Sequence, residues 1–175
     1  NGSTTNYGIN VIGAVTADSN STLIDSNNIT VVGTGVPASN IGIWIDSNTS
    51  NNNITNNNVS VYGTSNSQGI EFRGAAGTLC NTNLISSNNI LVNASAAASV
   101  TDYGIYFTAN TISNIILSNN ITTVGNTTGY GIYLVGAATT PVNNNIISLN
   151  NITTIGRGPS NYGIWLTLNA NSNNI

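Results

Sequence analysis

The chain has 175 residues, enough for one domain of ordinary size, and its net charge is -3. Only 4% of its residues are charged (2 Lys or Arg, 5 Asp or Glu, no His), against about 25% in an average soluble protein. Two cations cannot neutralise a row of phosphates, so we expect no nucleic-acid partner. One Cys without His excludes a Cys/His zinc site and an internal disulfide, and we expect no metal and no cofactor.

Three short blocks appear in order and then return along the whole chain. The first is Gly-Ile at Gly8, the second is a single Ile at Ile24, and the third is Asn27-Asn28 with the β-branched Ile29. Gly-Ile recurs at Gly42, Gly69, Gly104, Gly131 and Gly163; the single Ile at Ile54, Ile85, Ile116 and Ile147; and the Asn pair at 57–59, 88–90, 119–121 and 150–152. The Asn pairs step by 30, 31, 31 and 31 residues, so the chain is a repeat of about 31 residues.

Each block has the periodicity of a strand. Apolar and polar residues alternate over four or five positions, as in Ile43-Trp44-Ile45, and turns rich in Asn, Gly, Ser and Thr separate the blocks. Three short strands per repeat predict one coil of an all-β solenoid, with coils stacked about 4.8 Å apart. Five to six coils then give a rod about 26 to 29 Å long. No apolar run approaches the roughly 20 residues of a membrane-spanning helix.

The repeats are also paired into a unit of about 62 residues, because the Gly-Ile to Ile spacing alternates between 16 and 12. The longer loops carry a Gly-Ala step, as at Gly13-Ala14 and Gly74-Ala75. Three inward columns are predicted, from the Ile of the Gly-Ile block, the single Ile, and the residue after the Asn pair. The Asn pairs are expected to take left-handed or turn conformations and to hydrogen-bond along the stack as a ladder.

The repeat motif resembles that of a known family. The segment Asn-x-Ile-Ile-Ser-x-Asn-Asn-Ile followed by Tyr-Gly-Ile-Tyr-Leu is similar to the right-handed parallel β-helix repeat of pectin-lyase-like proteins, in particular the Asn-rich repeats of large secreted and cell-surface proteins. The resemblance covers nearly the whole chain, 1–175, as a single repeat region. It implies a fold rather than an activity, because the same coil serves lyases, glycosidases, tailspikes, adhesins and structural rods.

An enzyme on this scaffold needs clustered carboxylates, and the best pair is Asp46 with Glu71, on neighbouring coils. Arg73 lies beside them. We expect an exposed salt link between Asp46 and Arg73 rather than a catalytic pair, and therefore no enzyme and no catalytic residues.

The outward aromatics are the best candidate for a site. Trp44, Tyr106, Tyr133 and Trp165 occupy one outward column, which begins at Asn10 and is interrupted by Glu71. A second column precedes the Gly: Tyr7, Ile41, Gln68, Tyr103, Tyr130 and Tyr162; its direction is left open by the Gly. The column of Trp44 serves either to hold the sheet in register or to contact a polysaccharide or another rod.

Neither end of the sequence resembles a cap, so we expect more coils beyond the ends or head-to-tail stacking of copies. The predicted function is an extracellular or cell-surface structural or adhesive solenoid that builds filaments. The alternative is a carbohydrate-binding, tailspike-like adhesin. N-glycosylation is expected most readily at Asn48, Asn93 and Asn126. Cys80 is either buried or paired with another chain.

Overall fold

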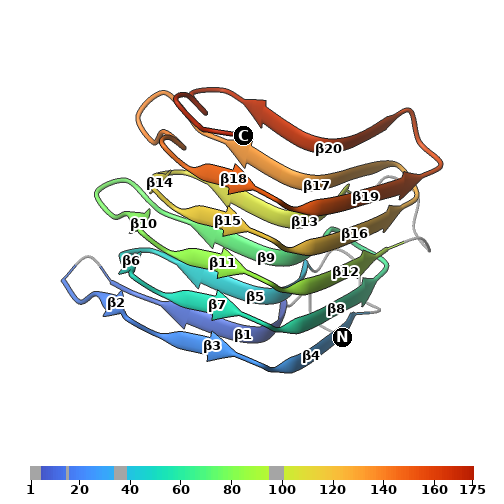
Figure 1. Cartoon of the computed structure of the whole chain (residues 1–175), viewed down its shortest axis with the longest axis horizontal. Helices are drawn as coiled ribbons and strands as arrows, with labels where there is room; N and C mark the ends of the chain where they lie inside the picture. The colour runs from blue at the N-terminus through green and yellow to red at the C-terminus, as the bar shows by residue number, and fades with distance from the viewer. Residues whose placement is uncertain (1–4, 15, 34–38, 95–100) are drawn as a thin grey trace.

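The computed structural model describes residues 5–14, 16–33, 39–94 and 101–175; the opening residues 1–4 of the sequence lie outside it. All described regular structure is β, and all strands in the four sheets pair in parallel. Successive coils stack from the N-terminal end to the C-terminal end, so that each strand lies on its counterpart one coil earlier (Figure 1). The predicted β-solenoid with a spacing of about 31 residues is confirmed.

Each sheet collects one strand from every coil that it crosses. The Gly-Ile sheet contains β1 (Asn6–Ile12), β5 (Asn40–Asp46), β9 (Ser67–Arg73), β13 (Thr101–Thr108), β17 (Thr128–Val135) and β20 (Ser160–Thr167). The three-residue sheet contains β3 (Leu23–Asp25), β7 (Asn53–Thr55), β11 (Leu84–Ser86), β15 (Ile115–Leu117) and β18 (Ile146–Ser148). The Asn-Asn-Ile sheet contains β4 (Asn28–Gly33), β8 (Asn58–Gly63), β12 (Asn89–Asn93), β16 (Asn120–Gly125) and β19 (Asn151–Gly156). We number the coils 1 to 6 by their Gly-Ile strand.

A fourth sheet was not expected. It consists of four two-residue strands, β2 (Ser19–Asn20), β6 (Thr49–Ser50), β10 (Cys80–Asn81) and β14 (Thr111–Ile112). A left-handed residue follows each of these strands, namely Ser21, Asn51, Thr82 and Ser113. In β6 and β14 two more precede the strand, as Ser47 and Asn48 do before β6 with φ of 45° each. Because the chain bends twice within a few residues, one expected corner becomes a short extended segment between two corners.

Every second coil carries an additional small turn after its Gly-Ile strand. In coils 1 and 3 the turn precedes the strand of the fourth sheet, and in coil 5 it lies where that strand would be. The turns are closed by antiparallel bridges at Ala14–Ala17, Ala75–Thr78 and Ala137–Thr140. They lie in coils 1, 3 and 5, where the sequence has its Gly-Ala steps. The predicted pairing of coils into a unit near 62 residues is therefore visible as alternating turns on one side.

The three predicted apolar columns form much of the core, which also contains Val31, Val61 and Val92 of the Asn-Asn-Ile sheet and Ile45, Phe72, Phe107 and Leu134 of the Gly-Ile sheet. Ile54, Ile85 and Ile116 are fully buried and pair in register in the three-residue sheet, as do Ile43, Ile70 and Ile105 in the Gly-Ile sheet. The third column runs through Ile29, Val59, Ile90, Ile121 and Ile152. Burying each such side chain contributes about 1.5–3 kcal/mol, and a solenoid obtains this contribution once per column in every coil.

Asparagine ladders close two of the corners. In the ladder of Asn27, Asn57, Asn88, Asn119 and Asn150, the backbone N–H and the Nδ2 of each residue both donate to the Oδ1 of the next, at 2.9–3.0 Å. The second member of each pair forms an exposed ladder that donates in the opposite direction, from Asn58 to Asn28 and onward. The predicted ladder is confirmed.

The left-handed conformation falls one residue earlier than the sequence suggested. It is taken by the residue before each pair, namely Ser26, Asn56, Ser87, Ser118 and Leu149, with φ of 55–57°. The Asn pair itself does not turn; it follows the turn and uses its amides to tie neighbouring coils together.

A second buried ladder was missed. Asn52, Asn83, Asn114, Asn145 and Asn173 make the same double donation to the next coil, at 2.8–3.1 Å. The sequence does contain its signal, an Asn two residues before the Ile of each of these coils.

Candidate functional site

Both outward columns lie on the same face of the Gly-Ile sheet. The register pairs Trp44 with Glu71, Glu71 with Tyr106, and Tyr133 with Trp165 as predicted. The column before the Gly, whose direction the sequence left open, also faces outward, because its rings contact those of the first column. Gly104 explains this: it is buried, and a Cβ on it would lie 2.2 Å from Cγ2 of Ile121 inside the solenoid. Residues on either side of the inward pair Gly104-Ile105 therefore both point out.

Rings of coils 4 to 6 form one continuous group, which we call the upper aromatic stack. Its members are Tyr103, Tyr106, Tyr130, Tyr133, Tyr162 and Trp165. Within a coil the ring centroids of Tyr103 and Tyr106 are 4.5 Å apart, and between coils those of Tyr106 and Tyr133 are 5.5 Å apart with planes 6° apart. Trp165 meets Tyr162 edge-on at 3.8 Å. The tyrosine faces are thus turned toward one another, and their edges face outward.

The two lower coils carry a separate aromatic pair. The rings of Tyr7 and Trp44 stack at 4.7 Å with planes 7° apart, and the guanidinium carbon of Arg73 lies 4.6 Å from the centre of the Trp44 ring. Coil 3 contributes Gln68 and Glu71 instead of rings, and these two side chains separate the pair from the upper aromatic stack.

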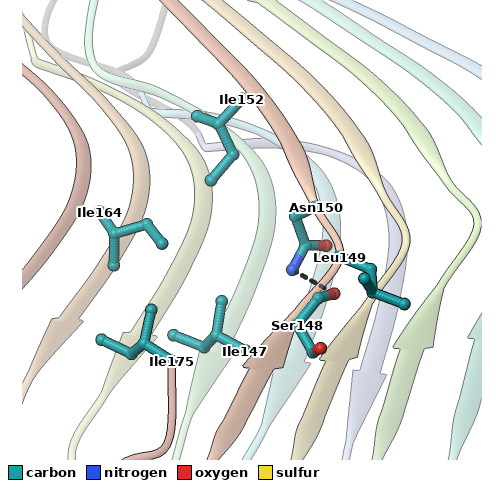
Figure 2. A pocket seen from close by; sticks show the side chains of 7 residues that line it. All are labelled: Ile147, Ser148, Leu149, Asn150, Ile152, Ile164 and Ile175. Atoms are coloured by element: carbon teal, nitrogen blue, oxygen red, sulfur yellow. Dashed lines mark hydrogen bonds between the residues drawn. The ribbon is translucent and has the colours of Figure 1, made fainter.

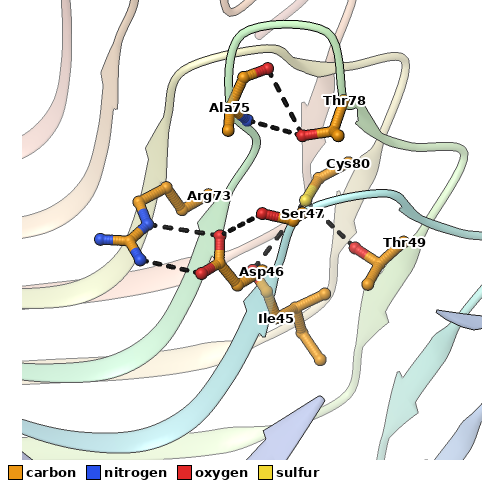
Figure 3. A network of polar contacts seen from close by, with 8 residues as sticks. All are labelled: Ile45, Asp46, Ser47, Thr49, Arg73, Ala75, Thr78 and Cys80. Atoms are coloured by element: carbon orange, nitrogen blue, oxygen red, sulfur yellow. Dashed lines mark hydrogen bonds and ion pairs between the residues drawn. The ribbon is translucent and has the colours of Figure 1, made fainter. Parts of the chain in front are cut away.

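The predicted ion pair between Asp46 and Arg73 is present, and Figure 3 shows its geometry. It was expected to be exposed, but only the Arg73 side chain is, at 46%, whereas the Asp46 side chain is 11% exposed. The guanidinium donates Nη2–H to Oδ2 of Asp46 at 2.8 Å and Nε–H to Oδ1 at 3.3 Å. The Ser47 hydroxyl donates to the same Oδ1 at 3.1 Å. The charge of the Asp46 carboxylate is therefore compensated by Arg73, which makes the carboxylate a weaker nucleophile and a weaker base.

Glu71 is the unusual group on this face. Only 7% of it is exposed, and burial raises its pKa to about 7, an effect that the nearby charge of Arg73 opposes and that of Asp46 reinforces. Close by, Nε1 of Trp44 and Oε1 of Gln68 are buried without a hydrogen-bond partner among the described residues. A carboxyl group whose pKa is raised to about 7 therefore lies between two aromatic clusters.

Asp102 is the most buried acid, and the repeat pattern did not single it out. It is 0% exposed, and neither carboxylate oxygen has a geometrically acceptable hydrogen bond within the described residues. Burial raises its pKa to about 7, although the backbone N–H groups of Ala94 and Ser67 act weakly in the other direction. Its position two residues before Gly104 is the available signal, because strand alternation from the outward Tyr103 places it inside.

The structure places Cys80 inside the solenoid. It is 0% exposed, and the Thr49 hydroxyl donates to its Sγ at 3.1 Å (Figure 3). Burial raises the pKa of the thiol to about 11. Of the two alternatives left by the sequence, the structure selects the buried thiol.

The three favoured glycosylation positions lie in different settings. Asn48 is half-buried in a left-handed turn, and its amide donates to the carbonyl of Ala14 and to the carboxylate of Asp18. Asn93 is half-buried at the end of β12, and the Ser95 that completes its motif lies outside the described residues. Asn126 is half-buried in the turn between β16 and β17.

The upper end of the solenoid holds an apolar hollow of about 240 Å³. Its lining includes Ile147, Ile152, Ile164 and Ile175, and Figure 2 shows the side chain of Ile175 beside that of Ile147. Asn174 bridges to Ile146 in parallel, so Ile175 continues the Ile column of the three-residue sheet.

Within the described ranges, no group of three or more His, Cys, Asp or Glu side chains could hold a metal ion. The same residues contain no helix long and apolar enough to cross a membrane. The chain matches no protein-family model, no curated protein and no solved structure.

Proposed function

We propose that this chain is a structural module of an extracellular or cell-surface rod, built from pectin-lyase-like repeats and extended by end-to-end stacking of coils. The observation that carries the proposal is the pair of buried Asn ladders. The first ladder joins coils 1 to 5 and the second joins coils 2 to 6, with two hydrogen bonds from each Asn to the next. Between coils 1 and 2 the second ladder is continued by a single bond, from the backbone N–H of Thr22 to Oδ1 of Asn52. The buried amide groups thus serve to hold neighbouring coils together.

The buried ladders also have a direction. Each Asn donates to the Asn of the following coil, so the first ladder has its acceptor side at Asn27 in coil 1, and the donor sides of the two ladders lie at Asn150 in coil 5 and Asn173 in coil 6. Two copies fit head to tail and not head to head, which is the heterologous contact that produces an open fibre. The apolar hollow beside Ile152 and Ile164 supplies a surface for an incoming strand.

The same groups support the proposal of a non-enzymatic role. Arg73 compensates Asp46, and Glu71 is almost fully covered, so the face offers no open carboxylate pair. The aromatic faces contact one another, which favours lateral packing of rods through the ring edges over stacking of a sugar on Tyr106 or Tyr133. The low charge and the Asn-rich turns are compatible with a secreted chain.

Electron microscopy of the purified chain over a concentration series, with light scattering on the same samples, tests the assembly. We expect fibres whose axial repeat is near the rod length of about 26 to 29 Å given by the strand spacing. A chain that stays monomeric at every concentration would refute head-to-tail stacking.

Two variants locate the contact. Ile175 lines the end hollow and is 66% exposed, whereas Leu168 is 69% exposed outside the lining of that hollow. Ile175→Asp should shorten or abolish fibres because it places a charge in the contact, and Leu168→Asp should leave them unchanged. Equal effects of the two substitutions would place the contact elsewhere.

A further inference from the structure

The upper aromatic stack is an unbroken path of oxidisable rings across three coils. Trp165 lies 3.8 Å from Tyr162 and 5.5 Å from Tyr130 between centroids. From Tyr130 the next steps are 4.7 Å to Tyr133 and 5.4 Å to Tyr103. Every step is a direct ring contact, and no saturated side chain intervenes.

Few other side chains in this protein can lose an electron easily. The sequence contains no Met and no His, and its single Cys is 0% exposed. All six rings of the upper stack are half-buried, so their outer edges meet solvent. A diffusing oxidant therefore meets Tyr and Trp in place of the sulfur groups that are usually oxidised first.

We propose that the upper aromatic stack is a relay for one-electron oxidation. Trp165 is oxidised first, and the radical is then transferred to the tyrosines of coils 5 and 4. The substrate class is a diffusing one-electron oxidant, such as a small inorganic radical. The oxidant gains one electron and becomes its anion, and Trp165 loses that electron and its indole N–H proton to water. Tyr162 or Tyr130 then gives one electron to the indolyl radical and its phenol proton to water, while the indole nitrogen regains a proton. The indole is restored, and a phenoxyl radical remains.

The surroundings of the phenols suit this proton-coupled step. Burial raises the pKa of Tyr103, Tyr106, Tyr130 and Tyr133, so these phenols are neutral at pH 7 and release their proton only when oxidised. A phenoxyl radical is the more stable product, because tyrosine at neutral pH is oxidised at a lower potential than tryptophan. The radical is therefore transferred from Trp165 to the tyrosines.

Pulse radiolysis with azide radical as the oxidant tests the relay. The parent for this experiment is Trp44→Phe, which leaves Trp165 as the single indole and keeps a ring against Tyr7. We expect the indolyl radical to decay by a first-order process, at a rate independent of protein concentration, with a matching rise of phenoxyl absorbance. Concentration-dependent decay, or decay without phenoxyl formation, would overturn the relay.

Phenylalanine substitutions define the path while keeping the rings stacked. Adding Tyr162→Phe should preserve phenoxyl formation, because Tyr130 also contacts Trp165. Adding Tyr162→Phe, Tyr130→Phe and Tyr133→Phe together should abolish the fast phase, that is, the first-order decay of the indolyl radical with its rise of phenoxyl absorbance. Oxidisable rings then remain only in coil 4 of the stack and outside it. Tyr62→Phe, on the Asn-Asn-Ile sheet, is the control and should change nothing. An unchanged fast phase in the triple variant, in samples whose circular dichroism shows the native fold, would refute a route through the stack.

Discussion

At the scale of single residues, the corner before each Asn pair selects for side chains that accept a left-handed backbone. Ser or Asn occupies it in coils 1 to 4, but coil 5 has Leu149, with φ of 56° and 81% exposure. A left-handed conformation costs an ordinary L-residue about 1–2 kcal/mol, and Asn tolerates it better. Leu149→Asn should therefore raise the free energy of unfolding by about 0.5–1 kcal/mol.

Urea denaturation measures this effect, and the same corner one coil earlier supplies the reverse change. Ser118 has φ of 55°, so Ser118→Leu should destabilise the protein by a similar amount. If neither variant shifts the urea midpoint, the left-handed corner is not a source of strain.

Asp102 is a second position where a side chain is unfavourable in its surroundings, because its ionisable carboxyl group is buried. This burial makes the free energy of unfolding depend on pH. The pKa of Asp102 is about 7 in the folded protein and 3.8 as its ordinary value. Below the ordinary value the carboxyl is neutral in both states and folding has no penalty. As pH rises toward 7 the unfolded chain ionises first, so stability falls over this window and then levels off. The loss corresponds to roughly 1.4 kcal/mol for each unit of raised pKa.

Asp102→Asn should flatten this part of the pH profile, as measured by urea denaturation from pH 4 to 7. A residual slope is expected, because Glu71 also has its pKa raised to about 7 and acts in the same direction. Asp25→Asn is the matched control: hydrogen bonds from Thr55, Asn56 and Ser26 lower the pKa of Asp25, so its effect falls below this window. An unchanged slope in Asp102→Asn would show that its carboxyl is solvated or paired in the folded state.

At the scale of the strand, the glycine of the Gly-Ile block sets how closely two sheets approach. A Cβ on Gly104 would lie 2.2 Å from Cγ2 of Ile121 and 2.5 Å from the carbonyl oxygen of Gly131. The carbonyl is backbone and cannot move aside. Gly104→Ala should thus cost about 2 kcal/mol or more, the range found for overpacked cores.

The repeat offers the matched control for this substitution. Gly163 holds the same register position in coil 6, and no described atom lies within 4 Å of a Cβ built on it. Gly163→Ala should change the free energy of unfolding by no more than about 0.5 kcal/mol. Thermal unfolding of both variants tests the comparison, and equal losses would show that backbone conformation, rather than sheet contact, requires the glycine.

The strand is also the scale at which sequence reasoning succeeds and then stops. Periodicity alone predicts which residues share a column, so Ile85 lies on Ile54 and Tyr133 on Tyr106 as expected. Periodicity says nothing about the angle of the chain at each corner. The extra strand at Cys80 depends on the corner at the left-handed Thr82. The direction of Tyr103 and the burial of Asp102 depend on Gly104 and Ile105, two successive residues within β13 that face the same side. The face-to-face contact of the tyrosines likewise depends on side-chain orientation, which spacing does not determine.

At the scale of the whole molecule, the chain is held together almost without charge. The described residues contain one ion pair, Arg73 with Asp46, and its Arg side chain is 46% exposed. The Asp46 side chain is only 11% exposed. Because the guanidinium still meets solvent, salt screens the pair, and we expect it to contribute about 1 kcal/mol, the upper end of the range for exposed pairs. The Ile columns and the Asn ladders are neutral, and screening by salt does not act on them. We therefore expect the free energy of unfolding to change by less than about 0.5 kcal/mol when sodium chloride rises from low to physiological concentration.

Urea denaturation at several sodium chloride concentrations makes this comparison, with Arg73→Gln measured in parallel. The small salt dependence that exists should disappear in Arg73→Gln, because the one pair that salt screens is then absent. A large stabilisation by salt in both proteins would mean that repulsion among acids such as Asp18 and Asp25 governs the fold. That outcome would contradict a rod whose cohesion is carried by neutral columns, each adding a fixed increment per coil, and would remove the basis for its extension by simple stacking.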